Sequence, residues 1–409
     1  MSSKSEGLNP IVTVLLAAAL VLAGTGLFQT LLPLRGDQEG FSTTLIGLLG
    51  TAYFGGFMIG CYFGPKFIRS VGHVRCFAGA AAMLTIVILA FPALVDPYVW
   101  GALRVVTGLA VAILFIVVES WLNDSSTNQN RGRVLAVYII VTNIATMAGQ
   151  VMVNLSSTQE NILFSIVAML VCAAIVPLAL TPTAAPKPIP SAKLDLRFLF
   201  ALSPAGAIGC FLVGAAEGAF WSLGPVFAQE RGMAISEVTL LMAAFVLGGT
   251  LSQWPLGWAS DKMDRRIVIS ATALGTVLTG LALAYWEPPA MWATFAVAVV
   301  HGALMVPLYA LCVSHANDRA PNERMVEISS GLLLVYSIGA TLGPLCAALF
   351  MEDGRPGGLF VFIAGVLGTM GLLVICRIVF KPLGEEGERV EFVPVPKSSQ
   401  SVYSLEADD

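Results

Sequence analysis

The sequence predicts an all-α membrane protein, with twelve transmembrane helices in two pseudo-symmetric six-helix bundles. Three observations lead to this prediction: an apolar composition, twelve long apolar runs, and an internal repeat in which the second half of the chain resembles the first. Hydrophobic residues make up 56% of the chain and charged residues 12%. A soluble domain carries about 25% charged residues, so the composition indicates that lipid surrounds most of this chain.

Each apolar run is close to the roughly 20 residues that an α-helix needs to cross about 30 Å of hydrocarbon. The first run follows a single lysine, Lys4, as a signal peptide would, but it is longer than the usual apolar region of about 7–15 residues. We therefore expect an uncleaved first helix. The predicted spans are residues 10–32, 43–64, 74–93, 97–118, 134–155, 161–181, 199–227, 236–258, 267–285, 289–313, 328–350 and 358–380.

Twelve spans place alternate loops on opposite sides of the membrane, and basic residues are distributed unevenly between these two sets of loops. One set carries only Arg35, Arg231 and Arg355. Loops rich in Lys and Arg stay in the cytoplasm, so we expect the other set, and with it both termini, to be cytoplasmic. The basic residues of that set are Lys66, Arg69, Arg75, Arg131, Arg133, Lys187, Lys193, Arg197, Lys262, Arg265, Arg266, Arg319 and Arg324.

The two halves of the chain share landmarks at offsets of 192 to 194 residues. The repeat predicts an N-terminal bundle at residues 1–180, a Pro-rich cytoplasmic linker at 181–197, a C-terminal bundle at 198–381 and an acidic, disordered cytoplasmic tail at 382–409. Parallel halves of this kind predict a site between them, near the midplane of the membrane. The matched pairs include Gly26 with Gly218, Phe28 with Phe220, Pro33 with Pro225, Gly56 with Gly249, Gly108 with Gly302, and Gly149 with Gly343.

The segment after the eighth span reads Gly257-Trp-Ala-Ser-Asp261-Lys262-Met-Asp264-Arg265-Arg266. It resembles the G-x-x-x-D-R/K-x-G-R-R signature of the major facilitator superfamily of transporters, with Asp264 in place of the second glycine. Arg104-x-x-x-Gly108 in the fourth span is similar to a second motif of that superfamily, and the resemblance covers about residues 8–381. The loop after the second span departs from the signature, because Ile68 stands where the family has Asp.

A second stretch, Val117-Val-Glu119-Ser-Trp followed by Asn130-Arg-Gly-Arg133, resembles a poorly characterised bacterial subgroup, the YcaD-like transporters. The resemblance implies a protein of the bacterial inner (plasma) membrane that takes a small-molecule substrate and needs no cofactor, and we expect a monomer. The fifth span ends in Gly149-Gln150 and lacks the Gly-Pro motif common in drug/proton antiporters of the superfamily.

Three deep ionisable residues, Arg104, Glu217 and His301, fall on spans 4, 7 and 10, where charge is costly. The resemblance implies that spans 1, 4, 7 and 10 line a central cavity, so we expect these residues to bind substrate or protons there. Arg104 offers a fork for a carboxylate, Glu217 shares a helix face with Trp221, and His301 can titrate near neutral pH. The alternatives are a structural ion pair for Arg104, a neutral hydrogen-bonded core acid for Glu217, and a hydrogen-bonded core histidine for His301.

Uncharged polar residues in the spans could contact the substrate or equally bond between helices. These candidates are Gln29, Asn143, Gln150, Gln253, Tyr309 and Tyr336.

We expect a cytoplasmic gate at the signature loop, where Asp261 can pair with a base and accept hydrogen bonds from a helix N-terminus. Glu119 lies fifteen residues after Arg104, or about 22 Å along a helix, so the two cannot pair. We expect Glu119 to pair with Arg131, Arg133 or another loop base. The alternative explanation for the basic residues of the signature loop is that they only keep this side of the protein in the cytoplasm. The predicted gate residues are Asp261, Lys262, Arg265, Arg266, Glu119 and Arg69.

Other function classes find no support in the sequence. It contains no GxxxxGK[ST], GxSxG, HExxH or CxxC pattern, and nothing indicates an enzyme, a metal site or a nucleic-acid partner. We therefore predict secondary active transport of a small organic solute by alternating access, as proton-coupled uptake of a polar or anionic metabolite. Proton-driven efflux of drugs or metabolites is the alternative, and a non-transporting assembly factor or sensor is the alternative of another class.

Overall fold

The computed structural model describes residues 10–126, 131–180, 195–287, 290–321, 324–352 and 354–380. These residues form helices, with no β-strand in the described ranges. Twelve of the helical segments are long and apolar enough to cross a membrane, which confirms the predicted all-α membrane fold. Most of the predicted linker and all of the predicted tail lie outside the described residues.

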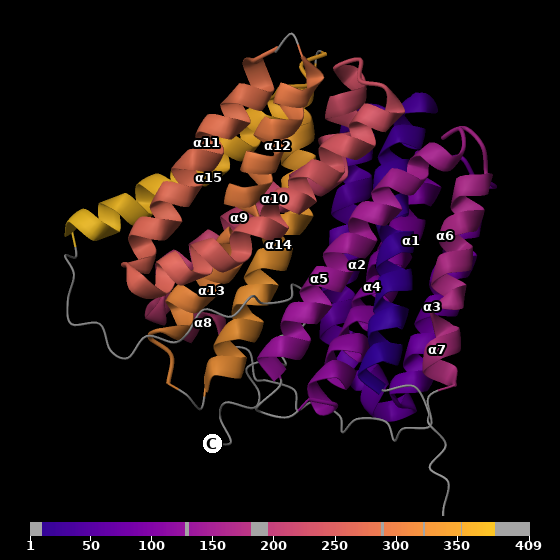
Figure 1. Ribbon diagram of the computed structural model, residues 1–409, viewed down its shortest axis with the longest axis horizontal. Coiled ribbons are helices and arrows are strands. Elements are labelled where there is room, and N and C mark those ends of the chain that lie inside the picture. Colours follow the sequence, from indigo (N-terminus) through magenta and orange to yellow (C-terminus); the bar gives the residue numbers. More distant parts are fainter. Residues whose placement is uncertain are drawn as a thin grey trace, which may run out of the picture.

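The first half of the chain contributes six spans, drawn in indigo to magenta in Figure 1. They follow the predicted spans, although α1, α2 and α4 extend one to two turns beyond their predicted ends. The elements are α1 (Pro10–Gln38), α2 (Thr43–Val71), α3 (His73–Ala90), α4 (Pro97–Asp124), α5 (Arg131–Val151) with the 3-10 turn η1 (Met152–Leu155), and α6 (Ile162–Ala173) with α7 (Ile175–Ala179).

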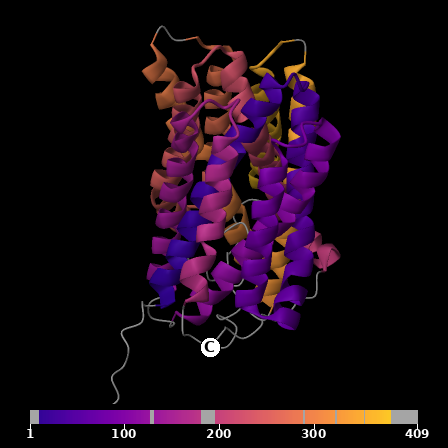
Figure 2. The ribbon, with the colours of Figure 1, turned by 90° about the vertical axis from the view of Figure 1, so that its right-hand side faces the viewer.

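The second half contributes the other six spans, and Figure 1 shows it beside the first half. Viewed from the side in Figure 2, the helices run along the same direction between two ends of the molecule. The elements are α8 (Leu196–Leu202), α9 (Pro204–Glu230), α10 (Ile235–Lys262), α11 (Arg265–Tyr285), α12 (Met291–Met305) with α13 (Leu308–Asn317), α14 (Met325–Met351) and α15 (Gly358–Phe380).

Two differences from the predicted spans lie next to prolines. The predicted seventh span begins at residue 199, but α9 begins at Pro204, because Ser203 leaves the helical region and caps the backbone N–H of Gly206. The tenth span is broken between α12 and α13 next to Pro307. A proline has no backbone N–H to donate, and its ring crowds the preceding turn. Helices therefore often end or bend at a proline.

Glycines bring neighbouring spans into backbone contact. A Cβ atom on Gly108 of α4 would overlap the carbonyl oxygen of Tyr53 in α2, and one on Gly302 of α12 would overlap that of Phe245 in α10. Small residues at such crossings allow close van der Waals packing where no hydrophobic effect drives helices together. The repeated glycines therefore mark the same helix contact in each half.

The contacts also refine the predicted repeat. Gly56 packs on Val105 of α4, and its counterpart by contact is Gly248, which packs on Val299 of α12. A Cβ on Gly249, the partner predicted from the internal repeat, would instead meet the side chain of Val306. The offset for this pair is therefore 192 rather than 193.

The two halves meet through a far-end seam, which we define by the hydrogen bonds Thr43–Glu230, Thr44–Glu352 and Gln229–Asp37. The seam lies opposite the basic end, the end that carries Arg69, Lys262 and the start of α1. Deeper in the bundle, the Thr51 hydroxyl donates to the carbonyl of Thr341 at 2.7 Å. These bonds hold the halves together from the far end to near mid-bundle.

Candidate functional site

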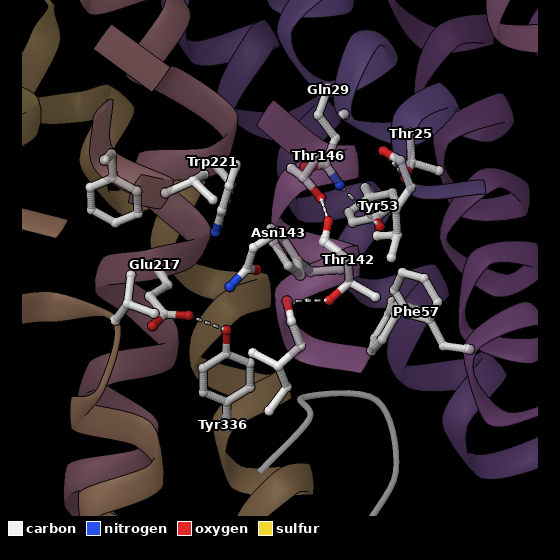
Figure 3. Close-up of a pocket in the computed structure, with 18 of the residues that line it drawn as sticks. Thr25, Gln29, Tyr53, Phe57, Thr142, Asn143, Thr146, Glu217, Trp221 and Tyr336 are labelled. Carbon is white, nitrogen blue, oxygen red and sulfur yellow. Dashed lines mark hydrogen bonds between the residues drawn. The ribbon is translucent and has the colours of Figure 1, made fainter. Parts of the chain in front are cut away.

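A cavity of about 280 Å³ lies between the two halves. Its wall reaches from Gln29 and Trp221, near mid-bundle, to Glu119 and Tyr138, close to the basic end. Figure 3 shows side chains from both halves pointing into it. The predicted position of a site between the halves thus coincides with a cavity, but α2, α5, α10 and α14 contribute to its wall as well as spans 1, 4, 7 and 10.

Glu217 of α9 lies on the cavity wall and is 1% exposed. The hydroxyl of Tyr336 in α14 donates a hydrogen bond of 2.6 Å to its Oε2 atom (Figure 3). Gly214 and Gly218 let α9 and α14 approach closely beside this pair, since a Cβ on either would overlap a backbone carbonyl of α14. The carboxyl group is therefore held in place at the cavity surface by a neighbouring helix.

Glu119 of α4 supplies a second carboxyl group to the same wall. Its Oε1 atom accepts a hydrogen bond of 3.3 Å from the hydroxyl of Tyr138 in α5. The sequence predicted a pairing with Arg131, Arg133 or another loop base, and it did not predict Tyr138 as a partner. The side chain of Arg131 lies outside the described part of the structure.

Uncharged polar side chains complete the wall. The Gln29 amide donates to the Tyr53 hydroxyl at 3.4 Å, and the Asn143 amide donates to Thr250 at 2.9 Å across the two halves. Gln253 also lines the cavity. Six of the ten residues named as candidates to contact substrate or protons therefore lie on one wall: Gln29, Asn143, Glu217, Trp221, Gln253 and Tyr336. Gln150 and Tyr309 are buried and do not line it.

Arg104 does not belong to the cavity wall, contrary to the expectation that it shares a site with Glu217. Its side chain is 5% exposed and lies behind Tyr53, with the guanidinium 4.4 Å from the ring centre. Its Nε atom donates to the carbonyl of Leu49 at 3.3 Å, and its Nη1 atom has no hydrogen-bond partner among the described residues. Tyr53 lines the cavity, and the guanidinium packs against its ring without reaching the cavity wall.

His301 also lies away from the cavity, inside the second half. It is fully buried, with Nδ1 2.9 Å from the hydroxyl of Thr279 and its ring 5.3 Å from that of Phe360. The three deep ionisable residues predicted to meet in one site are therefore separated, and only Glu217 faces the cavity.

At the basic end, the signature loop forms ion pairs within the second half. Arg265 is 2% exposed and contacts Asp261 at 3.1 Å and Asp318 at 2.9 Å. Lys262 lies over the ring of Trp258, 4.4 Å from its centre, and Arg69 donates to the carbonyl of Pro65. Asp318 was not predicted in this cluster, although Asn317-Asp318 repeats Asn123-Asp124 of the first half at an offset of 194 residues.

The sequence matches the profile of the Major Facilitator Superfamily over residues 14–207 and again over residues 206–404. The chain belongs to the major facilitator superfamily. Its members are transporters rather than enzymes, and the twelve spans make this chain an integral membrane protein.

Relatives and solved structures agree with this membership. The chain is 28% identical over 373 residues to the "Uncharacterized MFS-type transporter YcaD" of Salmonella typhi, covering 90% of this chain and 96% of that protein. The YcaD protein of Escherichia coli O45:K1 gives the same identity and coverage. The nucleoside transporter NupG has a similar fold, with a TM-score of 0.74 at 14% identity over 92% of this chain and all of that chain.

Asp264 shows how this superfamily member replaces a glycine of the signature. The backbone of Asp264 has a φ of −60°, which does not require glycine. Its carboxylate caps α11 by accepting the backbone N–H of Arg266 at 2.8 Å and pairs with the Arg266 guanidinium at 2.8 Å. Burial opposes ionisation, but the hydrogen bonds and charge of Arg266 outweigh it, and the pKa of Asp264 is lowered from its ordinary value.

Proposed function

We propose that the chain is a proton-coupled secondary transporter that moves a small organic solute across the bacterial inner membrane by alternating access. The observation that supports this most strongly is the buried carboxyl group of Glu217. It faces a cavity between the halves and accepts a hydrogen bond from the hydroxyl of Tyr336. A carboxyl group in such a site can take up a proton on one side of the membrane and release it on the other.

The arrangement of the halves supports a state open toward the basic end. The far-end seam joins the halves at the opposite end, while the cavity wall extends to Glu119 and Tyr138 near the basic end. With the orientation predicted from the basic loops, this is an inward-facing state in which both termini are cytoplasmic. Opening the seam while closing the basic end would give the outward-facing state.

The direction of transport depends on what the cavity binds. Uptake of a polar or anionic metabolite was favoured for two reasons: the fifth span lacks the antiporter Gly-Pro motif, and both Arg104 and Glu217 were expected in the cavity. The position of Arg104 behind Tyr53 removes the support for an anion. Proton-driven efflux needs a group that holds either a proton or the solute, and the cavity carboxyl groups meet this need. We therefore propose exchange of solute against protons. The non-transporting alternative gains no specific support from the cavity.

Reconstituted protein can test the coupling. A thermal-shift screen of metabolites and drugs would first identify a ligand, whose flux would then be measured in proteoliposomes with an imposed proton gradient. We expect gradient-driven flux in the wild type. In Glu217→Gln we expect ligand exchange without the gradient to continue while gradient-driven accumulation is lost.

The matched control is Glu160→Gln, which makes the same change at an exposed position outside the cavity. It should behave like the wild type. Gradient-driven flux that persists in Glu217→Gln would contradict proton coupling at this residue. A folded wild type that binds the ligand and never moves it would favour the sensor or assembly-factor alternative.

A further inference from the structure

We infer that the cavity binds a small organic cation with an aromatic or otherwise apolar body, and that the carboxyl groups of Glu119 and Glu217 attract its charge. This inference rests on the proposed transport function, because it assigns a substrate class to the same cavity.

The charge of the cavity wall points to a cation. Glu119 and Glu217 both line it, and the described residues of the wall include no lysine, arginine or histidine. Burial of carboxyl groups away from water is costly unless an opposite charge or a proton compensates it. A cation bound in the cavity would be attracted by these carboxyl groups, whereas an anion would add a further negative charge beside them.

Tyrosine hydroxyls fix both carboxyl groups before a ligand arrives. Tyr138 donates to Glu119 at 3.3 Å and Tyr336 donates to Glu217 at 2.6 Å. Each donor comes from a different helix than its acceptor, so the position of each carboxyl group depends on helix packing as well as on its own side chain. Such pre-organisation reduces the ordering that a ligand must otherwise impose.

Aromatic rings share the cavity wall with the carboxyl groups. Phe57, Phe115, Trp221 and Phe245 line the cavity, and Trp221 lies one helical turn after Glu217. The faces of aromatic rings attract ammonium groups and repel anions, with tryptophan the strongest of the natural side chains. The rings also offer apolar surface to the body of the ligand. The wall therefore suits a molecule that joins a positive charge to an apolar group.

The two carboxyl groups belong to different halves, since Glu119 is on α4 and Glu217 on α9. Residues of both halves line the cavity, so a ligand that fills it would contact both halves of the transporter. Occupancy of the cavity would then change the relative free energies of the open and closed arrangements, which is what alternating access requires of a substrate.

Two probes of similar size and opposite charge test the inference. Isothermal titration calorimetry would measure binding of phenyltrimethylammonium and of benzenesulfonate to the purified full-length protein. We expect the cation to bind and the anion not to bind. In Glu119→Gln and in Glu217→Gln we expect the affinity for the cation to fall about tenfold or more, as truncation of a buried charge partner does. Glu160→Gln should bind it as the wild type does.

Size-exclusion chromatography would first establish that each variant is folded. If one glutamine variant fails to fold, the other remains available, and Trp221→Leu should weaken cation binding through loss of the ring face. Equal or tighter binding of benzenesulfonate, no binding of the cation at millimolar concentration, or unchanged cation affinity in the folded variants would overturn the inference. A chain that prefers the anion yet still couples flux to a proton gradient would retain the proposed function and lose this substrate class.

Discussion

At the scale of single residues, the cavity is built from pairs in which a tyrosine of one helix holds a carboxyl group of another. Tyr336 holds Glu217 and Tyr138 holds Glu119. Arg104 is the opposite case, because its guanidinium is buried against the ring of Tyr53 with only a carbonyl as hydrogen-bond acceptor in the described residues. The tyrosine–carboxyl pairs position functional groups at the cavity. The buried guanidinium of Arg104 instead carries a desolvation cost that no ion pair among the described residues offsets.

Tyr336→Phe removes the hydroxyl that donates to Glu217 and keeps the ring. Loss of a buried hydrogen bond costs about 1–3 kcal/mol, so we expect the apparent melting temperature in detergent to fall by a few degrees. Tyr62→Phe is the matched control, since Tyr62 is 57% exposed on the outside of the bundle. Equal melting of both variants would mean that the Tyr336 hydroxyl does not stabilise the fold.

Arg104→Met should leave the fold intact. Replacing a buried charge by an apolar side chain of similar length is often neutral or stabilising by about 1–4 kcal/mol. Arg104→Lys should instead lower the melting temperature, because it keeps a buried charge and loses the planar contact with Tyr53. Thermal unfolding of the two purified variants checks the order, and a lower melting temperature for Arg104→Met than for Arg104→Lys would contradict it.

The depth of residues along the helices could be predicted from the sequence better than the direction in which they point around the helix axis. Glu217 and Trp221 were expected in the cavity and line it, whereas Arg104 and His301, at plausible depths on the expected spans, face away from it. In a bundle of apolar helices nearly every face is apolar, so the pattern carries little information about rotation. The contact between Glu119 and Tyr138 depends on the packing of α4 against α5, which local sequence does not encode.

At the scale of helices, glycines and caps determine how the spans pack and where they end. Gly108 and Gly302 allow α4 to touch α2, and α12 to touch α10. These contacts explain why the repeat was visible as a series of glycines: the residues that must stay small are the same in both halves. Asp264 similarly replaces a signature glycine by a residue that caps α11.

Gly302→Ala should destabilise the protein, because the added Cβ would overlap the backbone carbonyl of Phe245. Overpacking of this kind typically costs about 1–3 kcal/mol. Gly101→Ala is the matched control, since a Cβ there meets no atom within 4 Å. We expect a lower melting temperature for Gly302→Ala and an unchanged or higher one for Gly101→Ala; the reverse order would refute the assigned contact.

Acidification should weaken the contribution of Asp264. Its pKa in the folded protein lies below the ordinary value of 3.8, so its stabilising effect is complete above that value and is lost as the pH falls through the lower, folded-state pKa. The difference in melting temperature between wild type and Asp264→Asn should therefore be present at pH 7 and shrink below about pH 4.

Arg266→Gln supplies the control for that pH dependence, because it removes the partner that lowers the pKa of Asp264. In the Arg266→Gln background, the difference in melting temperature between the protein with Asp264 and its Asp264→Asn variant should be smaller and should depend less on pH. A difference that stays constant from pH 7 to pH 3 in the wild-type background would contradict the assigned ion pair.

At the scale of the whole molecule, the halves touch along the far-end seam and enclose a cavity nearer the basic end. Twelve spans and a duplicated plan could be predicted from the sequence, because lipid requires long apolar runs and the duplication preserves their order. The conformational state could not, since a transporter sequence must be compatible with two arrangements of the same halves. Only the structure brings Thr44 and Glu352 together, from opposite ends of the sequence.

Alternating access around the acidic cavity is the central claim, and paired spin-label distances test it most directly. One pair would label Ser42 and Ser236 at the far end, and the other Ser70 and Met263 at the basic end, all exposed and in a background without the seven native cysteines. Double electron–electron resonance would compare wild type with Glu217→Gln, which mimics the protonated acid. We predict opposite changes, one pair lengthening as the other shortens. Distances that stay fixed, or that change together at both ends, would contradict the account.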